Sequence, residues 1–189
     1  MTDKVTKGKI EQWRAMPRSS AAGIAAADEY YDRVILPAAA EEFIRTYQND
    51  ETHYENMFLT LGTSWQPLAL SIMLHSPRRA VFLGTEDVAP EVEKIIGFID
   101  DPALEYSVEI VDKGSSEKLL KRTAEIYTEL ADRESTCFDI TGGTKAMVAA
   151  AAMMAAKLGL DVYYIESRFI PLLRRPEPFS ERLVKLEKP

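Results

Sequence analysis

Two adjacent glycines flanked by threonines and followed by a lysine have the composition of an anion-binding loop. They lie at Thr141 to Lys145, within the stretch DITGGTKAM. Glycines leave backbone N–H groups unobstructed, and a helix that starts here presents free donors and the positive end of its dipole. Lys145 in the first helical turn would oppose that dipole unless an anion lay beside it. The stretch predicts an anion site; the alternative is a tight turn with Thr144 as the helix N-cap.

The established phosphate-binding signatures do not fit this loop. A P-loop needs four residues between its first glycine and Gly-Lys-Ser/Thr, whereas here the glycines are adjacent and Thr144 precedes Lys145. A dinucleotide fingerprint needs G-x-G-x-x-G after the first strand, where this chain has GTSWQP with a single glycine. We therefore expect neither ATP hydrolysis nor NAD chemistry.

Two other segments combine glycine with hydroxyl groups directly after an apolar run. They are Gly62 to Gln66 and Gly84 to Asp87. Small residues let a ligand approach the backbone closely, and hydroxyls can bind phosphate or ribose oxygens. Because ligands of open parallel sheets bind at the carboxyl ends of the strands, we expect the three segments to share one edge of a sheet.

The elements that would position these loops alternate between strand and helix. Apolar runs at 57–62, 79–85, 104–112, 137–141 and 160–167 alternate with helical patterns at 64–76, 86–100, 115–133 and 143–159. This alternation predicts an α/β, Rossmann-like fold with a mainly parallel sheet and helices on both faces. The segments 168–175 and 182–186 flank a proline-containing turn, PEPFSE, which predicts a terminal β-hairpin or edge strand pair.

The N-terminal part differs from this pattern. Residues 8–50 have apolar side chains at helical spacing, and Pro37 predicts a kink or the start of a second helix. We expect an N-terminal helical extension at 1–50 and a ligand-binding domain at 54–189.

Length and charge narrow the class of protein. The 189 residues suffice for one compact domain with a short appendage. A net charge of −7 argues against binding long nucleic acid, but not against a small anion held by backbone amides. The longest apolar run, Ala146 to Ala156, is about half of the roughly 20 residues that cross a bilayer, so we expect a buried helix and no membrane span.

The cysteine and the two histidines of this sequence do not indicate a disulfide or a metal site. Cys137 is the one cysteine, so we expect no internal disulfide and a cytoplasmic location. It lies in an apolar stretch, which is typical of a small core residue. His53 and His75 have no partners at metal-ligand spacing, so we expect both at the surface or at loop edges, and neither a metal nor another cofactor.

The patterns LTLGTSWQPLALSI and FDITGGTKAMVAAAAMMAAKLG, followed by DVYYIES, resemble the CARF (CRISPR-associated Rossmann fold) domain family. The resemblance spans about residues 57–188, and DITGGTKAM is its most specific part. It implies a homodimer that senses cyclic oligoadenylate, a tetra- or hexa-adenylate, in type III CRISPR antiviral signalling, with the ring on the dimer two-fold.

Carried onto this chain, the resemblance implies a set of ligand-binding residues from the three loops. They are Gly62, Thr63, Ser64, Trp65, Gln66, Thr85, Glu86, Thr141, Gly142, Gly143, Thr144, Lys145 and Met147. Trp65 would either stack on an adenine or anchor its own loop. Helices within 8–50 would pack on the sheet or extend the dimer interface.

Three functions follow as hypotheses. The first is a sensor without catalytic residues that couples ring binding to an effector domain or partner. The second is a ring nuclease in which the 2′-hydroxyl of adenosine attacks the adjacent phosphate without a metal, with Lys145, Thr144 and the Gly143 amide stabilising charge. The third is a nucleotide-binding protein of Rossmann type outside this family.

Overall fold

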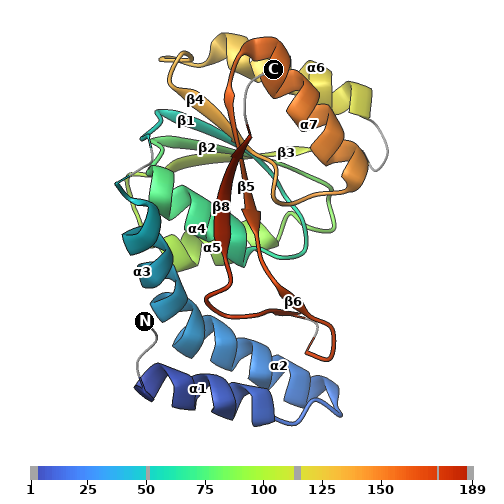
Figure 1. Ribbon diagram of the computed structural model, residues 1–189. Coiled ribbons are helices and arrows are strands. Elements are labelled where there is room, and N and C mark those ends of the chain that lie inside the picture. Colours follow the sequence, from blue (N-terminus) through green and yellow to red (C-terminus); the bar gives the residue numbers. More distant parts are fainter. Residues whose placement is uncertain (1–3, 50–51, 113–115, 174, 187–189) are drawn as a thin grey trace. The chain divides into compact units, whose positions relative to one another are not determined.

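The computed structural model describes residues 4–49, 52–112, 116–173 and 175–186 (Figure 1). Contacts group the chain into two compact units, which we call the helical unit and the sheet unit. The helical unit comprises residues 1–48 and 167–182, and the sheet unit comprises 49–166 and 183–189. Residues 167–182 thus group with the N-terminal helices although they follow the last parallel strand.

The sheet unit alternates strand and helix along the chain, as the sequence predicts. In order, its elements are β1 (Asn56–Thr60), α4 (Gln66–His75), β2 (Arg79–Gly84), α5 (Glu91–Ile99), β3 (Glu105–Ile110), α6 (Ser116–Glu129), β4 (Thr136–Asp139), α7 (Lys145–Leu158), β5 (Asp161–Glu166) and β8 (Arg182–Leu186). The predicted α/β, Rossmann-like fold is confirmed.

The sheet has the strand order β3-β2-β1-β4-β5-β8, and its first five strands are parallel. β8 lies beside β5 at one edge and runs in the opposite direction (Figure 1). The central strands β1 and β4 are buried along their whole length, as strands covered on both faces must be. β3 differs: it is the other edge strand, and Tyr106 and Ile110 on it are half exposed.

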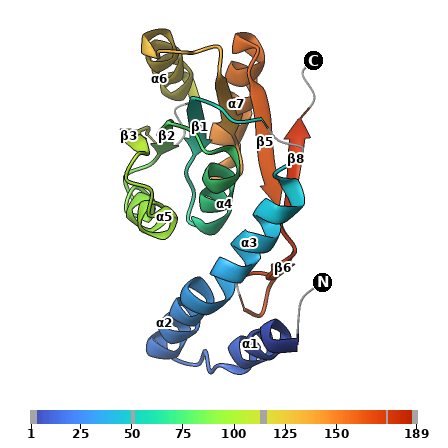
Figure 2. The ribbon, with the colours of Figure 1, turned by 90° about the vertical axis from the view of Figure 1, so that its left-hand side faces the viewer.

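Helices cover both faces of this sheet. α6 packs against α7 on one face, and α4 packs against α5 on the other (Figures 1 and 2). The core under α6 and α7 includes Phe58 and Phe138, whose rings stack at 5.4 Å between centroids. Cys137 is buried in the sheet, where the sequence places it.

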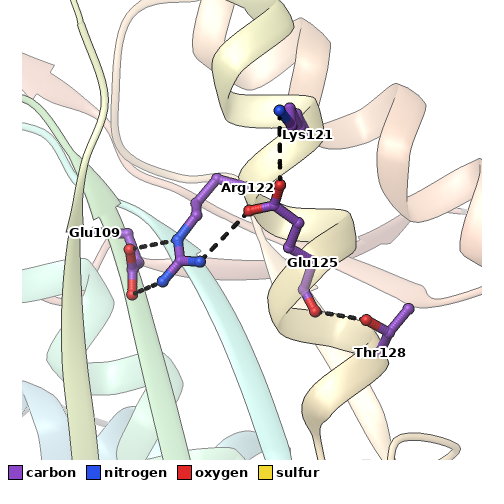
Figure 3. Close-up of polar contacts among 5 residues, drawn as sticks. All are labelled: Glu109, Lys121, Arg122, Glu125 and Thr128. Carbon is purple, nitrogen blue, oxygen red and sulfur yellow. Dashed lines mark hydrogen bonds and ion pairs between the residues drawn. The ribbon is translucent and has the colours of Figure 1, made fainter.

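Ion pairs join α6 to the edge strand β3. Arg122 donates two hydrogen bonds to the carboxylate of Glu109, at 2.8 and 3.2 Å, and also pairs with Glu125 on its own helix (Figure 3). These charges lie on a solvated helix face, so each pair contributes little to stability.

The helical unit has more breaks than the sequence pattern predicts. It consists of α1 (Lys4–Ala15), α2 (Ala21–Tyr30), the π-helical turn η1 (Tyr31–Ile35), α3 (Leu36–Tyr47) and the antiparallel pair of β6 (Phe169–Ile170) and β7 (Arg175–Pro176). Pro37 lies in the first turn of α3, which agrees with the predicted helix start. The break at 16–20 was not predicted; Ser20 there caps α2 by accepting a hydrogen bond from the Gly23 amide at 3.1 Å.

A salt bridge fastens the hairpin to the helices inside this unit. Arg175 on β7 donates to both carboxylate oxygens of Asp28 on α2, at 2.9 and 2.8 Å. Its guanidinium also lies 5.9 Å from the ring centroid of Tyr31. This paired, planar contact explains why residues 167–182 belong with the N-terminal helices.

Candidate functional site

The loops after β1 and β4 meet at the point where the sheet reverses its direction of growth. From β1 the chain adds β2 and β3 on one side, and it then returns to place β4 on the other side of β1. At such a switch point the chain leaves two neighbouring parallel strands toward opposite faces of the sheet, and ligands of this fold class bind there. The segments 62–66 and 141–145 both begin there.

Glycines let the backbones of these two loops touch. A Cβ at Gly142 would lie 2.3 Å from the carbonyl oxygen of Thr60 and 2.7 Å from the amide nitrogen of Gly62. A Cβ at Gly62 would lie 2.8 Å from the Gly143 nitrogen, and Gly143 has a φ of +87°. Thr60 Oγ1 donates to the Gly142 carbonyl at 2.7 Å. The two loops therefore form one packed backbone surface that larger residues would disrupt.

The polar groups on this surface come from both loops. Thr63 and Ser64 after β1 are exposed, as are Gly143, Thr144 and Lys145 after β4. The Thr144 hydroxyl accepts from the Met147 amide at 3.3 Å and so caps α7, which is the capping role considered above. Within the described part of the chain, Lys145 has no carboxylate within ion-pair distance, although it stands at the unfavourable end of the helix dipole.

A buried carboxylate that the sequence reasoning did not select lies beneath the loop. Asp139 ends β4 with no solvent exposure, and its Oδ1 accepts from the Thr141 amide at 2.7 Å. Thr141 Oγ1 in turn accepts from the Ile165 amide at 2.8 Å, which ties the loop to β5. Burial raises the pKa of Asp139 above its usual range, against the opposing effect of the Ser71 hydroxyl and of the Thr141 hydroxyl and amide. An aspartate inside the apolar run CFDI was the available signal.

Four of the predicted ligand-binding side chains are buried: Thr85, which is described below, and Trp65, Gln66 and Met147. Trp65 is 5% exposed and meets Phe98 edge-to-face at 5.6 Å between centroids, an arrangement that favours the loop-anchoring role. Gln66 and Met147 are 4% and 5% exposed. Met147 packs against the glycine loop, because a Cβ at Gly143 would lie 3.4 Å from the Met147 Cβ.

Thr85 and Glu86 stand on the neighbouring strand end, in a more acidic setting. The Thr85 hydroxyl donates to Asp87 Oδ1 at 2.6 Å. Together with Asp87, Ile110, Val111 and Asp112, these two residues line a hollow of about 440 Å³. Carboxylates in this hollow repel phosphate, so it suits a neutral, amino-bearing group better than the anionic part of a ligand.

The opposite end of the sheet contains a buried aromatic and polar cluster. His75 has no solvent exposure, so the expectation of a surface or loop-edge histidine is wrong for it. Its ring lies 4.2 Å from that of Tyr163, and its Nδ1 donates to the Thr52 carbonyl at 3.1 Å. Burial lowers the pKa of His75 to about 4. His75 is the last residue of α4, which packs on the sheet, and the local sequence pattern does not predict the burial that results.

Among the residues with described positions, no three His, Cys, Asp or Glu side chains gather closely enough to hold a metal ion. None of the described helices has both the length and the apolarity that crossing a bilayer requires.

Comparison with known proteins adds one finding about the fold. No protein-family model and no curated protein matches the sequence. Among solved structures, Can2 from Sulfobacillus thermosulfidooxidans, solved in complex with cyclic tetra-adenylate, is similar with a TM-score of 0.54 and 16% identity. The likeness shows that this chain shares its fold with part of Can2. The similarity covers 75% of this chain and 39% of Can2, so the matched region is well under half of that protein.

The order of the strands in the sheet accounts for the placement of the loops. The parallel strands bring the segments after β2, β1 and β4 to three adjacent positions along one sheet edge. Of these, the β1 and β4 segments share a backbone contact. The β2 segment lies one strand further along and faces the acidic hollow.

Proposed function

We propose that this protein binds cyclic oligoadenylate through the loops after β1 and β4. The observation that carries the proposal is the fused glycine backbone of residues 60–62 and 142–143, bordered by the exposed hydroxyls of Thr63 and Ser64 and the amino group of Lys145. A cyclic oligonucleotide offers phosphate oxygens to the amides and the lysine, and ribose hydroxyls to the threonine and serine.

The ring would be bound by a homodimer in type III CRISPR signalling. A ring with rotational symmetry placed on a two-fold axis meets the same loop from each subunit, which doubles a modest set of contacts. The binding would then be passed to an effector domain or a partner. The likeness to Can2, which was solved with cyclic tetra-adenylate, makes that ring the first ligand to test.

Titration calorimetry with cyclic tetra-adenylate tests the proposal, with cyclic hexa-adenylate, linear tetra-adenylate and AMP as comparisons. We expect saturable binding of a cyclic ligand, with one ring per two chains, and a dimeric mass by light scattering. The absence of binding would contradict the proposal. Binding that favours AMP over both rings would also contradict it, and would support the hypothesis of a nucleotide-binding protein of Rossmann type outside this family.

Chromatography of the same samples separates a sensor from a ring nuclease. The exposed part of the two loops offers Lys145 and hydroxyl groups but no histidine or carboxylate to move a proton. We therefore expect the ring to remain intact over hours at excess protein. Linear products with a 2′,3′-cyclic phosphate end would instead assign cleavage to this site.

A further inference from the structure

Only one of the two carboxylate oxygens of the buried Asp139 has a hydrogen-bond partner among the described residues. Its Oδ1 accepts from the Thr141 amide at 2.7 Å. Its Oδ2 is also buried but takes no hydrogen bond from any residue with a described position. The hydroxyls of Ser71 and Thr141 are near enough to lower its pKa, yet neither has hydrogen-bond geometry to Oδ2. A buried carboxylate oxygen without a donor is costly and invites a functional explanation.

Within the described ranges of the chain, no cation forms an ion pair with Asp139. Asp139 is in register with Leu59 on β1 and Tyr163 on β5, so the three side chains point to the same side of the sheet. Besides Asp139, only Tyr163 among the three can titrate, and α4 adds Ser71 and, one turn later, His75. Lys185 on β8 lies 5.3 Å from the Tyr163 ring centroid, where it pairs with Asp161.

The loop that follows Asp139 leads to one cation, Lys145. Lys145 begins α7 but its side chain is exposed, and no charged group figures among the causes of the pKa shift of Asp139. A negative charge on Asp139 is therefore held directly beneath the loop that we propose for phosphate binding, without local compensation.

We propose that Asp139 is a positioning residue for the loop 140–145 and that its carboxylate makes anion binding at this loop proton-linked. By accepting from the Thr141 amide it fixes the start of the loop, while Thr141 Oγ1 fixes the same residue to β5. When a phosphate approaches, its charge and that of the ionised carboxylate repel each other across a region of low dielectric. Uptake of one proton by Asp139 removes that repulsion, so the complex binds a proton that the free protein releases. The second half of this proposal rests on the proposed function, whereas the first half does not.

The proton linkage is tested by calorimetry with cyclic tetra-adenylate between pH 5.5 and 8. Measurements in two buffers of different ionisation enthalpy give the number of protons taken up. For the unmodified protein we expect the affinity to fall as the pH rises, by up to tenfold per pH unit, with net proton uptake. D139N, which keeps the shape but cannot ionise, should bind with a flat pH dependence and no uptake from this site.

A matched carboxylate serves as the control. Asp100 is exposed and ends α5 in the left-handed region at a φ of 51°, a conformation that asparagine accepts. D100N should therefore behave like the unmodified protein. An equal pH slope in D139N and the unmodified protein, or the absence of proton uptake in the latter, would overturn the linkage.

The positioning role is tested without a ligand. Amide hydrogen exchange at residues 141–143 should become at least tenfold faster in D139A, while D139N, which retains an oxygen acceptor, should stay near the unmodified protein. Unchanged exchange in D139A would overturn it. If D139A does not fold, the NMR chemical shift of the Thr141 amide proton provides the test. It should change with pH in the unmodified protein as Asp139 ionises, and this change should be missing in D139N. The same change in both proteins would contradict the positioning role of Asp139.

These experiments separate the two proposals. A protein that binds no cyclic ring refutes the proposed function and with it the linkage, but fast loop exchange in D139A would still establish the positioning role. A protein that binds the ring with no dependence on Asp139 keeps the proposed function and refutes the inference.

Discussion

At the scale of single residues, Gly142 is the position where the two loops leave the least room. An added Cβ would lie 2.3 Å from the Thr60 carbonyl oxygen, and both groups are backbone, so neither can swing away. We expect G142A to lower the free energy of unfolding by about 1–3 kcal/mol, as overpacking does, and to weaken ring binding as well. Chemical denaturation and calorimetry measure the two effects.

Gly97 provides the matched control for this substitution. It lies inside α5, and a Cβ there would meet nothing within 4 Å. G97A should therefore stabilise the protein, by about 0.5–1 kcal/mol, because alanine is the better helix former. If G142A were as stable as G97A, the backbone contact at Gly142 would be looser than the distances indicate.

Lys145 is expected to separate binding from stability. As a cation at the start of α7 it opposes the helix dipole, so K145A should leave the free protein as stable as before, or more stable by about 0.3–1 kcal/mol. The same change should weaken ring binding by roughly tenfold or more, the worth of a charge-assisted hydrogen bond.

Lys157 in the last turn of the same helix is the control for Lys145. There a cation favours the dipole, and the residue is far along α7 from the loop. K157A should slightly destabilise the protein and leave ring affinity unchanged. The reverse pattern, with binding lost in K157A and kept in K145A, would move the anion site away from residues 141–145.

At the scale of elements, the sequence predicted what is local and missed what depends on distant contacts. The β4 strand, the glycine loop and α7 were expected close to their observed bounds, because an apolar run, a turn and a helical pattern each leave a local signature. The break at 16–20 was missed although Pro17 and the N-cap Ser20 are local signals of a helix boundary. The meeting of β1 with β4, and the burial of Asp139 and His75, follow from strand order and helix packing. No short window of sequence contains that information.

α4 extends from the candidate site to the buried cluster at the other end of the sheet, and that end predicts acid sensitivity. His75 must stay neutral in the folded protein, with a pKa of about 4, whereas the unfolded chain binds a proton near its ordinary value of 6.5. Its contribution to stability is therefore complete above about pH 6.5 and is lost as the pH falls toward 4, by up to about 3 kcal/mol.

Denaturation at pH 4 to 7 measures this loss. H75N keeps a donor for the Thr52 carbonyl but cannot take up a proton in this range, so it should lose less stability than the unmodified protein as the pH falls. A parallel decline in both proteins would assign the acid sensitivity to other groups. NMR titration of the His75 ring checks the low pKa directly.

At the scale of the whole molecule, the chain passes between its two units three times, at 48/49, 166/167 and 182/183. All thirteen residues predicted to bind the ligand belong to the sheet unit. Weakening the helical unit should therefore leave ring binding intact, and Arg175 is the residue with which to weaken it. R175A removes both hydrogen bonds to Asp28 and its contact with Tyr31, at a cost of about 1.5–3 kcal/mol within that unit.

Hydrogen exchange and calorimetry on R175A then report on the two units separately. We expect faster exchange at 21–35 and 167–173, with ring affinity within about twofold of the unmodified protein, since each unit has its own core. R33A is the control, because the Arg33–Glu29 pair is exposed on η1 and such pairs contribute little. If R175A instead abolished ring binding while R33A did not, the binding competence of the glycine loops would depend on the order of the helical unit.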